Sequence, residues 1–529
     1  MPTIITNNLK LLGAENLLST IDLPEDTNNL YFFVGKSTAW STTTVPTPVD
    51  SVAQENDHWA NMLSLKRLTA SDNVRLCIPT NQWTTSTTYA AYDDTTNVYA
   101  PSFVLADREN YRVYKCIDNN NNSASTVKPT GTLTSIFQTA DGYYWKYMYT
   151  ISSEDIVNFL SANWMPIQTL NSDDSGEHGA QWSIQQSSIT SGIEYVKLLN
   201  GGSGYTKIIS STNLTFNPSV TMILTPPSSI TTDNYYTGGT VYMHKNDGST
   251  VQARLIVSYT ASTNIATLNA NWSPAIDYTD GWQYKVLPTI ELNSDGANAI
   301  IEPTVSTTGI ITGLTIFETG TGYHVAQPSI TGCGGSGATM SVKISPKDGH
   351  GFDAVKEAKA HHLMFSTKLA YNEPGFLQTN DYRKIGLVKN VSAYGSTTIA
   401  GSSYSNFIAY QTISTTSESA AFVQDELFTQ TVPSQTTGLR AKGIVIEHSV
   451  TSHTLKFYQD ETTGFTPFTT TTGTPTYEII SASEKTATVG TYSAPTVEKY
   501  RGNILYVEQR SPITRDGENN ESFKIIIEF

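Results

Sequence analysis

Two segments of the chain share a pattern in which an apolar stretch ends in Gly-x-Gly-Tyr. Residues 193–207 read IEYVKLLNGGSGYTK, and residues 311–325 read ITGLTIFETGTGYHV. The matching positions are Gly202, Gly204 and Tyr205 in the first copy and Gly320, Gly322 and Tyr323 in the second. Glycine adopts the positive φ that reverses a chain, and a tyrosine ring can close such a turn against a core. The pattern predicts two small β modules, and two copies are too few for a solenoid.

The composition extends this β prediction to the whole chain. Of 529 residues, 38% are hydrophobic and only 15% are charged, and the remainder is rich in Thr, Ser, Asn and Gly. The 29 tyrosines and the short apolar runs favour strands and turns over helices. We therefore predict a mainly β fold with a few short helices, in a multi-domain, β-sandwich-like architecture with inserted small β modules.

Local patterns predict individual elements. The expected strands are 30–40 (a buried strand followed by a turn), 111–118, 141–151, 380–391 and a pair within 497–529 that is joined by a turn containing Asp516 and Gly517. The expected helices are 57–69, 152–160 and 345–365. Residues 396–496 are Ser/Thr-rich and are expected to form strands and loops.

The segment 345–365, SPKDGHGFDAVKEAKAHHLMF, contains three of the nine histidines and suggests a metal site. On a helix, His350, Glu357 and His361 would point nearly the same way. However, seven residues of helix rise about 10 Å, which is too far for two side chains to share one ion. Only Glu357 and His361 could then meet, and two ligands make a weak site. The alternative is a scaffold helix, docked on a sheet through Phe352, Val355 and His362 with Lys356 and Lys359 in solvent.

Residues 332–337, GCGGSG, match the letters of a dinucleotide-binding loop. Such a site needs a helix immediately afterwards, whereas ATMSVKI (338–344) alternates like a strand. The match therefore predicts a β-turn. No other nucleotide, nucleophile or metal motif is present, and we predict no catalytic, cofactor-binding or metal-ligating residue and no cofactor.

Charge and cysteine content restrict the partners and the compartment. The net charge is −15 and no dense Lys/Arg cluster is present, which argues against nucleic acid as a partner. No apolar run is long enough to span a bilayer, and the first residues do not resemble a signal peptide. Three cysteines at distant positions, Cys77, Cys116 and Cys333, indicate neither a disulfide framework nor a zinc knuckle and suit a reducing cytosol.

A series of short stretches carries a family resemblance. In order they are YFFVGKSTAW and PVDSV (31–52), DHWANM (57–62), CIPTNQW (77–83), YRVYKCID (111–118), DGYYWKYMY (141–149), NDYRKIGLVKN (380–390) and GNILYVEQRSPITRDGENNESFKIIIEF (502–529). This series resembles the baseplate wedge proteins, the gene product eight family, of T-even-type contractile-tailed phages. SPKDGHGFDAVKEAKAHH is similar to wedge sequences from cyanobacterial relatives of those phages. The chain resembles an enlarged, cyanophage-like version of the family.

The resemblance covers about residues 1–170, 345–392 and 497–529, and it suggests a domain plan. We expect a wedge-family β domain at 1–185, inserted β modules at 186–346, a helix and strand of the family core at 347–395, an inserted Ser/Thr-rich β region at 396–496, and a C-terminal β-hairpin of the family core at 497–529.

The resemblance also implies a function. It implies a non-enzymatic virion component that forms homodimers and links wedge scaffold proteins to peripheral parts that carry fibres or spikes. Its expected location is the tail baseplate, after assembly in the host cytoplasm, with neither nucleic acid nor membrane as a partner.

Two other classes of function stay open. One is a tail-associated carbohydrate-binding protein or depolymerase, with Tyr144 and Trp145 lining a sugar groove. The other is a metal-dependent hydrolase that uses His350, Glu357 and His361.

Overall fold

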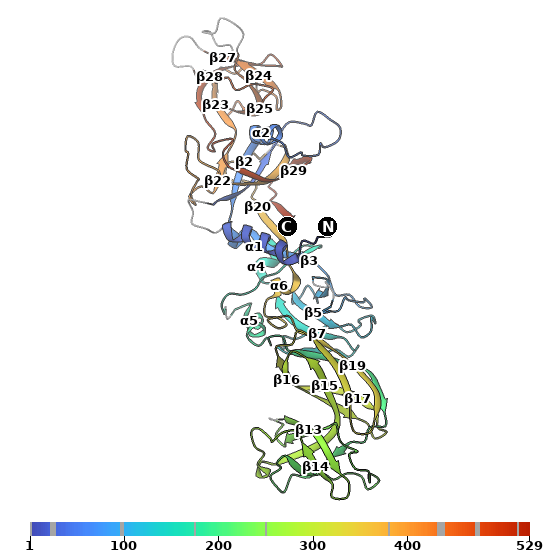
Figure 1. Cartoon of the computed structure of the whole chain (residues 1–529). Coiled ribbons are helices and arrows are strands. Elements are labelled where there is room, and N and C mark those ends of the chain that lie inside the picture. Colours follow the sequence, from blue (N-terminus) through green and yellow to red (C-terminus); the bar gives the residue numbers. More distant parts are fainter. Residues whose placement is uncertain are drawn as a thin grey trace. The chain divides into compact units, whose positions relative to one another are not determined.

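A computed structural model describes residues 3–21, 28–95, 100–173, 176–248, 251–378, 381–430, 440–470, 477–515 and 518–529. The chain is 42% strand and 11% helix, which confirms the predicted mainly β fold. It divides into two compact units (Figure 1). Unit 1 comprises Met1–Cys77, Glu154–Leu160 and His361–Phe529, and unit 2 comprises Ile78–Ser153 and Ser161–Ala360.

A five-stranded antiparallel sheet forms the centre of unit 1. Its order is β22 (Asn406–Ile408), β2 (Met62–Leu68), β1 (Leu30–Gly35), β21 (Asp381–Lys389) and β29 (Asn503–Thr514). Every residue of β1 is buried, as the apolar run LYFFVG predicts for a central strand. Tyr31 and Phe33 of β1 pack with Trp59 and Phe407 in one core. Residues from both ends of the chain therefore build a single sheet.

A second set of strands in unit 1 centres on β20 (His362–Leu369). This strand pairs with β3 (Val74–Pro79) on one side and with β30 (Glu521–Glu528) on the other. The helices of this unit are α1 (Asn7–Ile21), α2 (Val52–Ala60), α3 (Ala70–Asn73) and α4 (Ser153–Asn158). Helix α1 packs against β20 through a face that includes Leu11 and Ala14.

The Ser/Thr-rich region folds as a small closed barrel. Its strands, in barrel order, are β23 (Gln411–Thr416), β26 (Thr454–Tyr458), β25 (Lys442–Ser449), β24 (Leu427–Gln430), β27 (Glu478–Ser481) and β28 (Thr486–Ser493). Phe428, Phe457 and Phe468 pack together at its centre. Closure leaves the barrel without free edges, which explains how a region with so few large apolar residues holds together.

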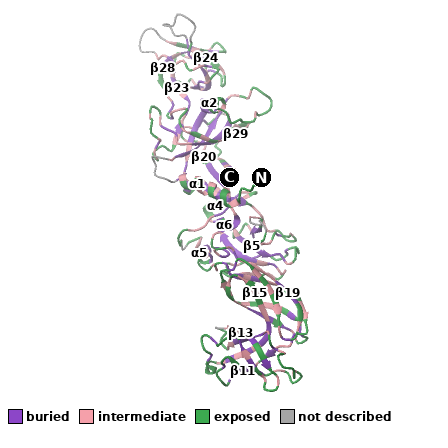
Figure 2. Cartoon of the chain, in the orientation of Figure 1, coloured by how far each residue is buried: buried purple, intermediate pink, exposed green. Residues whose placement is uncertain are grey.

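Unit 2 begins with an aromatic sheet of order β4 (Phe103–Leu105), β5 (Arg112–Asp118), β7 (Tyr144–Thr150) and β6 (Phe137–Gln138). The same unit also contains η1 (Ala100–Ser102), β8 (Trp164–Pro166), α5 (Gly179–Gln186), which packs against β7, and α6 (Ala354–Ala358). Strands β5 and β7 confirm two of the predicted strands. Both are almost wholly buried, as the purple ribbon in Figure 2 shows.

In the described part of the remainder of unit 2, every element except the short 3-10 turn η2 (Tyr278–Asp280) is a β-strand. One sheet has the order β10 (Ile208–Ile209), β15 (Trp282–Ser294), β12 (Gly239–Lys245), β13 (Val251–Thr260), β14 (Ile265–Leu268) and β11 (Thr221–Ile223), and β18 (Ala326–Thr331) also pairs with β15. Two further pairs are β9 (Ile193–Ser203) with β19 (Ser336–Ile344), and β16 (Ala297–Val305) with β17 (Ile311–Thr321).

The two Gly-x-Gly-Tyr copies adopt equivalent structures, as predicted. All four glycines have positive φ, and both tyrosines are buried. The Tyr205 ring covers Gly335 and its hydroxyl accepts a hydrogen bond from the Ala338 backbone N–H. In the second copy the Tyr323 ring covers Gly296, and its hydroxyl accepts a hydrogen bond from the Ala299 backbone N–H. Each tyrosine thus closes its turn against a Gly-x-x-Ala segment of the neighbouring strand.

Three local predictions are wrong. Residues 57–69 are not one helix, because α2 ends at Ala60 and β2 begins at Met62. Within 345–365 only Ala354–Ala358 is helical, since Lys359 adopts a left-handed conformation that ends the helix and β20 follows. The last two strands are not a hairpin, because β29 pairs with β21 whereas β30 pairs with β20. The predicted turn at Asp516 and Gly517 lies outside the described residues.

The tyrosine plugs should contribute strongly to the stability of unit 2. Tyr205→Ala removes a buried ring and should lower the free energy of unfolding by about 3–5 kcal/mol. Urea denaturation followed by circular dichroism measures this loss. Tyr278→Ala, in the same unit but at an exposed position, is the matched control and should cost about 0.5 kcal/mol or less. Equal losses for the two variants would contradict a stabilising role of the buried Tyr205 ring.

Candidate functional site

The histidine-containing segment of unit 2 lies over a buried group of charges. His350 and the side chains of Lys115 and Glu357 are each less than 5% exposed. Lys115 Nζ lies 2.7 Å from Glu357 Oε2 and 3.1 Å from His350 Nδ1. The second carboxylate oxygen of Glu357 accepts a hydrogen bond from the Gly351 N–H at 2.6 Å. We call Lys115, Lys146, Glu194, His350 and Glu357 the Lys115 cluster.

A second ion pair completes the Lys115 cluster. Lys146 Nζ lies 3.4 Å from Glu194 Oε2, and the other oxygen of Glu194 accepts from the Ser345 hydroxyl at 2.7 Å. Tyr92 closes one side, with its ring centroid 4.1 Å from Lys115 Nζ. Each buried carboxylate therefore has both a cationic partner and a hydrogen-bond donor, as a charge in a dry interior requires.

The protonation states follow from this geometry. Burial and the adjacent Lys115 charge both lower the pKa of His350, so the ring is neutral and its Nδ1 can accept from Lys115. Burial alone would raise the pKa of Glu357, but the Lys115 charge and the contacts that Glu357 makes with His350 and Lys115 together outweigh burial and lower the pKa to about 2. The ammonium group of Lys115 thus supplies the positive charge that a metal ion would otherwise have to provide. His361 belongs to unit 1 and lies beside Glu528 instead.

The sequence of the 141–151 strand suggests Tyr143, Tyr144, Trp145 and Tyr147 as the residues that would line a sugar groove, but these residues lie mainly in the core. Tyr143, Trp145 and Tyr147 are fully buried, and the first two stack with ring centroids 5.4 Å apart. Tyr144 is partly exposed and packs edge-on against Tyr195. The strand therefore presents no open aromatic face to a sugar. The glycine motif at 332–337 is a turn that leads into strand β19, as predicted, and not into a helix.

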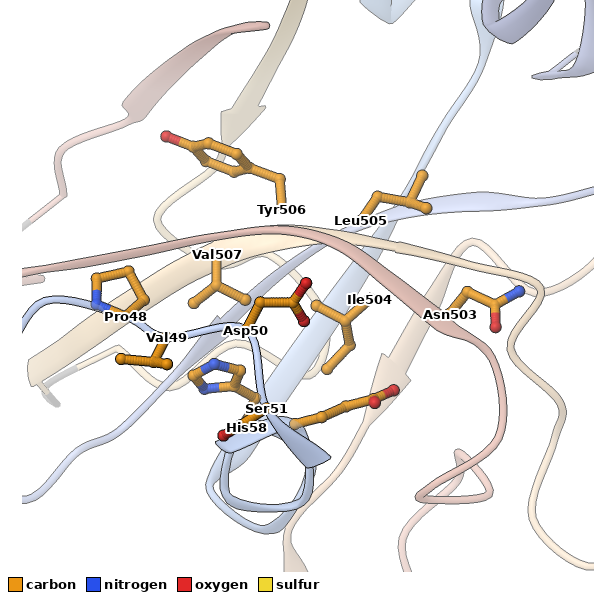
Figure 3. Close-up of a pocket in the computed structure, with 11 residues that line it drawn as sticks. Pro48, Val49, Asp50, Ser51, His58, Asn503, Ile504, Leu505, Tyr506 and Val507 are labelled. Atoms are coloured by element: carbon orange, nitrogen blue, oxygen red, sulfur yellow. The ribbon is translucent and has the colours of Figure 1, made fainter. Parts of the chain in front are cut away.

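A groove in unit 1 is the strongest candidate for a functional site (Figure 3). It has a volume of about 430 Å³ and is lined by Pro48, Val49, Asp50, Ser51, Glu55 and His58 from one part of the chain and by residues 503–507 of β29 from another. We call it the β29 groove. Ser51 caps helix α2 by accepting from the Gln54 N–H, and this cap fixes the path of the 48–51 segment. Val49 is 60% exposed at the rim.

A bulge in β29 shapes the groove. Tyr506 pairs with Leu387 and Ile504 pairs with Val388, which leaves Leu505 as an extra residue. Figure 3 shows Ile504 and Val507 on the side of the 48–51 segment, and Leu505 and Tyr506 on the other side of β29. Bulges are common on edge strands and next to functional sites, where they redirect side chains. Here the bulge leaves Leu505 about 40% exposed.

His58, which lines the groove, contacts a third buried lysine, Lys384. Lys384 Nζ lies 2.6 Å from Asp57 Oδ2 and 3.1 Å from His58 Nδ1. Burial and the charge of Lys384 lower the pKa of His58 to about 4, so this ring is neutral at physiological pH. Trp40 covers Lys384 with its ring and donates from Nε1 to the Arg510 carbonyl of β29 at 3.0 Å.

These contacts join the stretches that carry the family resemblance. GKSTAW supplies Trp40, PVDSV supplies the groove wall, and DHWANM supplies Asp57 and His58. NDYRKIGLVKN supplies Lys384, and the final stretch supplies the whole of β29. The sequence alone indicated these stretches but not that they meet, because they come from opposite ends of the chain.

Comparison with known proteins provides no assignment: no protein-family model matches the chain, and no curated protein matches it significantly. None of the helices in the described part of the chain combines the length and apolar character needed to cross a membrane. All three cysteines are buried free thiols.

The Lys115 cluster should be essential to the folding of unit 2. Lys115→Met leaves the Glu357 carboxylate buried without a counter-charge, and should cost about 3–5 kcal/mol of unfolding free energy. Lys128→Met is the matched control, because Lys128 pairs with Asp107 at a far more exposed position. It should cost about 1 kcal/mol at most. Urea denaturation measures the unfolding free energy of both variants, and similar losses would contradict a stabilising role of the Lys115 cluster.

The same cluster should make stability sensitive to acid. The folded pKa of Glu357 lies below its unfolded value, so its contribution is complete above about pH 5 and disappears as the pH falls towards 2. The double variant Lys115→Met with Glu357→Leu lacks this contribution. The difference in unfolding free energy between the wild type and the double variant should therefore shift in favour of the variant between pH 5 and 2. A difference that stays constant with pH would contradict the ionised pair.

Proposed function

We propose that this chain is a structural component of the baseplate wedge of a contractile phage tail. It links wedge scaffold proteins to peripheral parts that carry fibres or spikes, and it acts through protein–protein contact without chemistry. Its place is the virion, at the tail baseplate, and it assembles in the host cytoplasm. The proposal includes a homodimer, with the same surface patch used on both subunits.

One observation carries the proposal. Five of the stretches that resemble wedge proteins come together in the central sheet of unit 1 and around the β29 groove, although they come from three widely separated parts of the chain, residues 31–62, 380–390 and 502–529. A resemblance scattered along a chain by chance would have no reason to converge on one sheet. Convergence is expected where the matching residues build one interaction surface.

The groove has features suited to a protein partner. The apolar side chain of Val49 is accessible at its rim, and its wall carries the acids Asp50 and Glu55. Leu505 is accessible on the other side of the adjoining strand β29. Apolar anchors within a polar rim are typical of interfaces between proteins. Strand β29 is also an edge of its sheet, and among the described residues its backbone pairs only with β21. An extended segment of a partner could therefore add to this edge as a further strand.

Changes in the groove (Val49) and on the opposite side of the β29 edge (Leu505) should weaken assembly without unfolding the chain. Val49→Asp and Leu505→Asp each place a charge at an exposed apolar position, and each should leave the unfolding free energy within about 0.5 kcal/mol. Co-purification with wedge proteins from phage-infected cells should fall at least severalfold for both. Leu199→Asp is the control, since Leu199 is 60% exposed, like Val49, and lies in unit 2, outside the resemblance.

Locating the chain in purified particles tests the function itself. We expect it in the tail baseplate, and its absence from intact virions would end the proposal. The competing carbohydrate-binding function predicts instead that the purified chain binds host polysaccharide, which glycan arrays measure. Stoichiometric sugar binding by a chain that does not join the wedge would favour that alternative.

A further inference from the structure

Two histidines and a glutamate of unit 1 converge near the end of strand β30. In the antiparallel pairing of β20 with β30, His362 lies directly opposite Glu528. His361 immediately precedes β20, and its carbonyl accepts a hydrogen bond from the Phe529 N–H at 3.1 Å. Within the described part of the chain, one ligand atom from each of His361, His362 and Glu528 lies within 4.8 Å of the other two.

From this geometry we propose that His361, His362 and Glu528 bind a divalent first-row metal ion, with Zn²⁺ the best fit. The donor set is two imidazole nitrogens and one carboxylate oxygen, which are common zinc ligands. The proposal is independent of the wedge function. It also differs from the His350, Glu357 and His361 set considered from the sequence, and from our expectation that the chain has no metal ligand.

The distances suit a tetrahedral ion. Zn–N bonds of about 2.0–2.1 Å place neighbouring ligand atoms about 3.4 Å apart. His361 Nε2 lies 3.5 Å from one oxygen of Glu528, and His362 Nε2 lies 3.9 Å from the other. Both rings therefore face the same carboxylate. The side chain of Glu528 is 57% exposed, so its carboxylate can rotate into the coordination sphere without displacing the core.

The surroundings indicate how a metal would enter. Lys10 of helix α1 lies 3.0 Å from Glu528 Oε1 and neutralises that carboxylate. The side chains of Lys10 and Glu528 are 31% and 57% exposed, so this ion pair is weak enough to be exchanged for a stronger ligand. The two imidazole rings lie only 4.5 Å apart, a separation at which two charged rings would repel and two neutral rings can share an ion. Metal binding would displace Lys10 and leave a fourth position for water.

A bound ion would fasten the end of β30 to β20. Glu528 belongs to the last strand and the histidines to its neighbour, so the ion would cross-link the two strands. Because an ion that binds only the folded state stabilises that state, the melting temperature should rise with metal concentration.

The test uses the full-length chain, treated with EDTA and then freed of chelator. Zn²⁺ titrated into it, followed by isothermal titration calorimetry, should bind at one equivalent per chain and raise the melting temperature. His361→Ala and Glu528→Gln should each weaken binding about tenfold or more and abolish the thermal shift. Lys10→Met should strengthen binding, because it removes the competing cation.

The matched control is His324→Ala. His324 is an exposed histidine whose Nδ1 lies 3.0 Å from a single carboxylate, Asp295, so its loss should leave the affinity unchanged. Circular dichroism in EDTA checks the folding of each variant, and Glu528→Gln, at an exposed position, provides the test if His361→Ala does not fold. Absence of zinc binding by the wild type, or wild-type affinity in both ligand variants, would overturn the proposal.

Discussion

The pairing of β1 with β21 is the contact on which unit 1 depends. It joins residues 30–35 to residues 384–389, so about 350 residues of chain must leave and return before the sheet can close. Such a closure is entropically unfavourable, and burial of all six residues of β1 provides the compensating stabilisation. Once β1 is fixed, β2 and β21 lie on either side of it and β29 takes the outer edge. The groove follows directly, because only this order places residues 503–507 beside residues 48–51.

Buried ion pairs between lysines and carboxylates also connect distant segments of the chain. Lys115, Lys146 and Lys384 are each about 1–2% exposed, and each contacts a carboxylate supplied by a distant part of the chain. Burying a charge costs free energy, and the pairing recovers it only when the intended partner arrives. A misplaced segment would leave a lysine without a counter-charge. These pairs therefore select the correct docking of the segments more than they add to net stability.

Much of the local structure could be predicted because it depends on neighbours in the sequence. The β1 run, the aromatic strands β5 and β7 and the glycine turns with Tyr205 and Tyr323 all follow from short patterns. The helix predicted at 57–69 failed because its apolar residues fit a helical period and also fit an alternating strand. Residues 62–68 form strand β2 because they pair with β1, and tertiary contacts of this kind often override local preference. Closure of the barrel and the absence of a terminal hairpin depend on distant pairings that no local pattern encodes.

The glycine turns and the β29 groove also differ in how far the sequence predicts them. The contacts of Tyr323 could have been predicted from the sequence, since Gly296 and Ala299 repeat the spacing of Gly335 and Ala338. That spacing could have been found by looking for the partner of each tyrosine. The β29 groove carries no such signal, because its two walls become neighbours only through the sheet.

The last two strands, β29 and β30, are each at the edge of a sheet, and the two edges differ in how they are protected. An open edge invites pairing with other chains and is usually protected. The end of β30 carries a charged residue, Glu528, held by Lys10 and faced by two histidines. Strand β29 has a bulge and an apolar groove at its edge instead. Protection at one edge and accessibility at the other fit the proposed role of a component that joins other proteins. Under that proposal β29, and not β30, is the edge to which a partner would add.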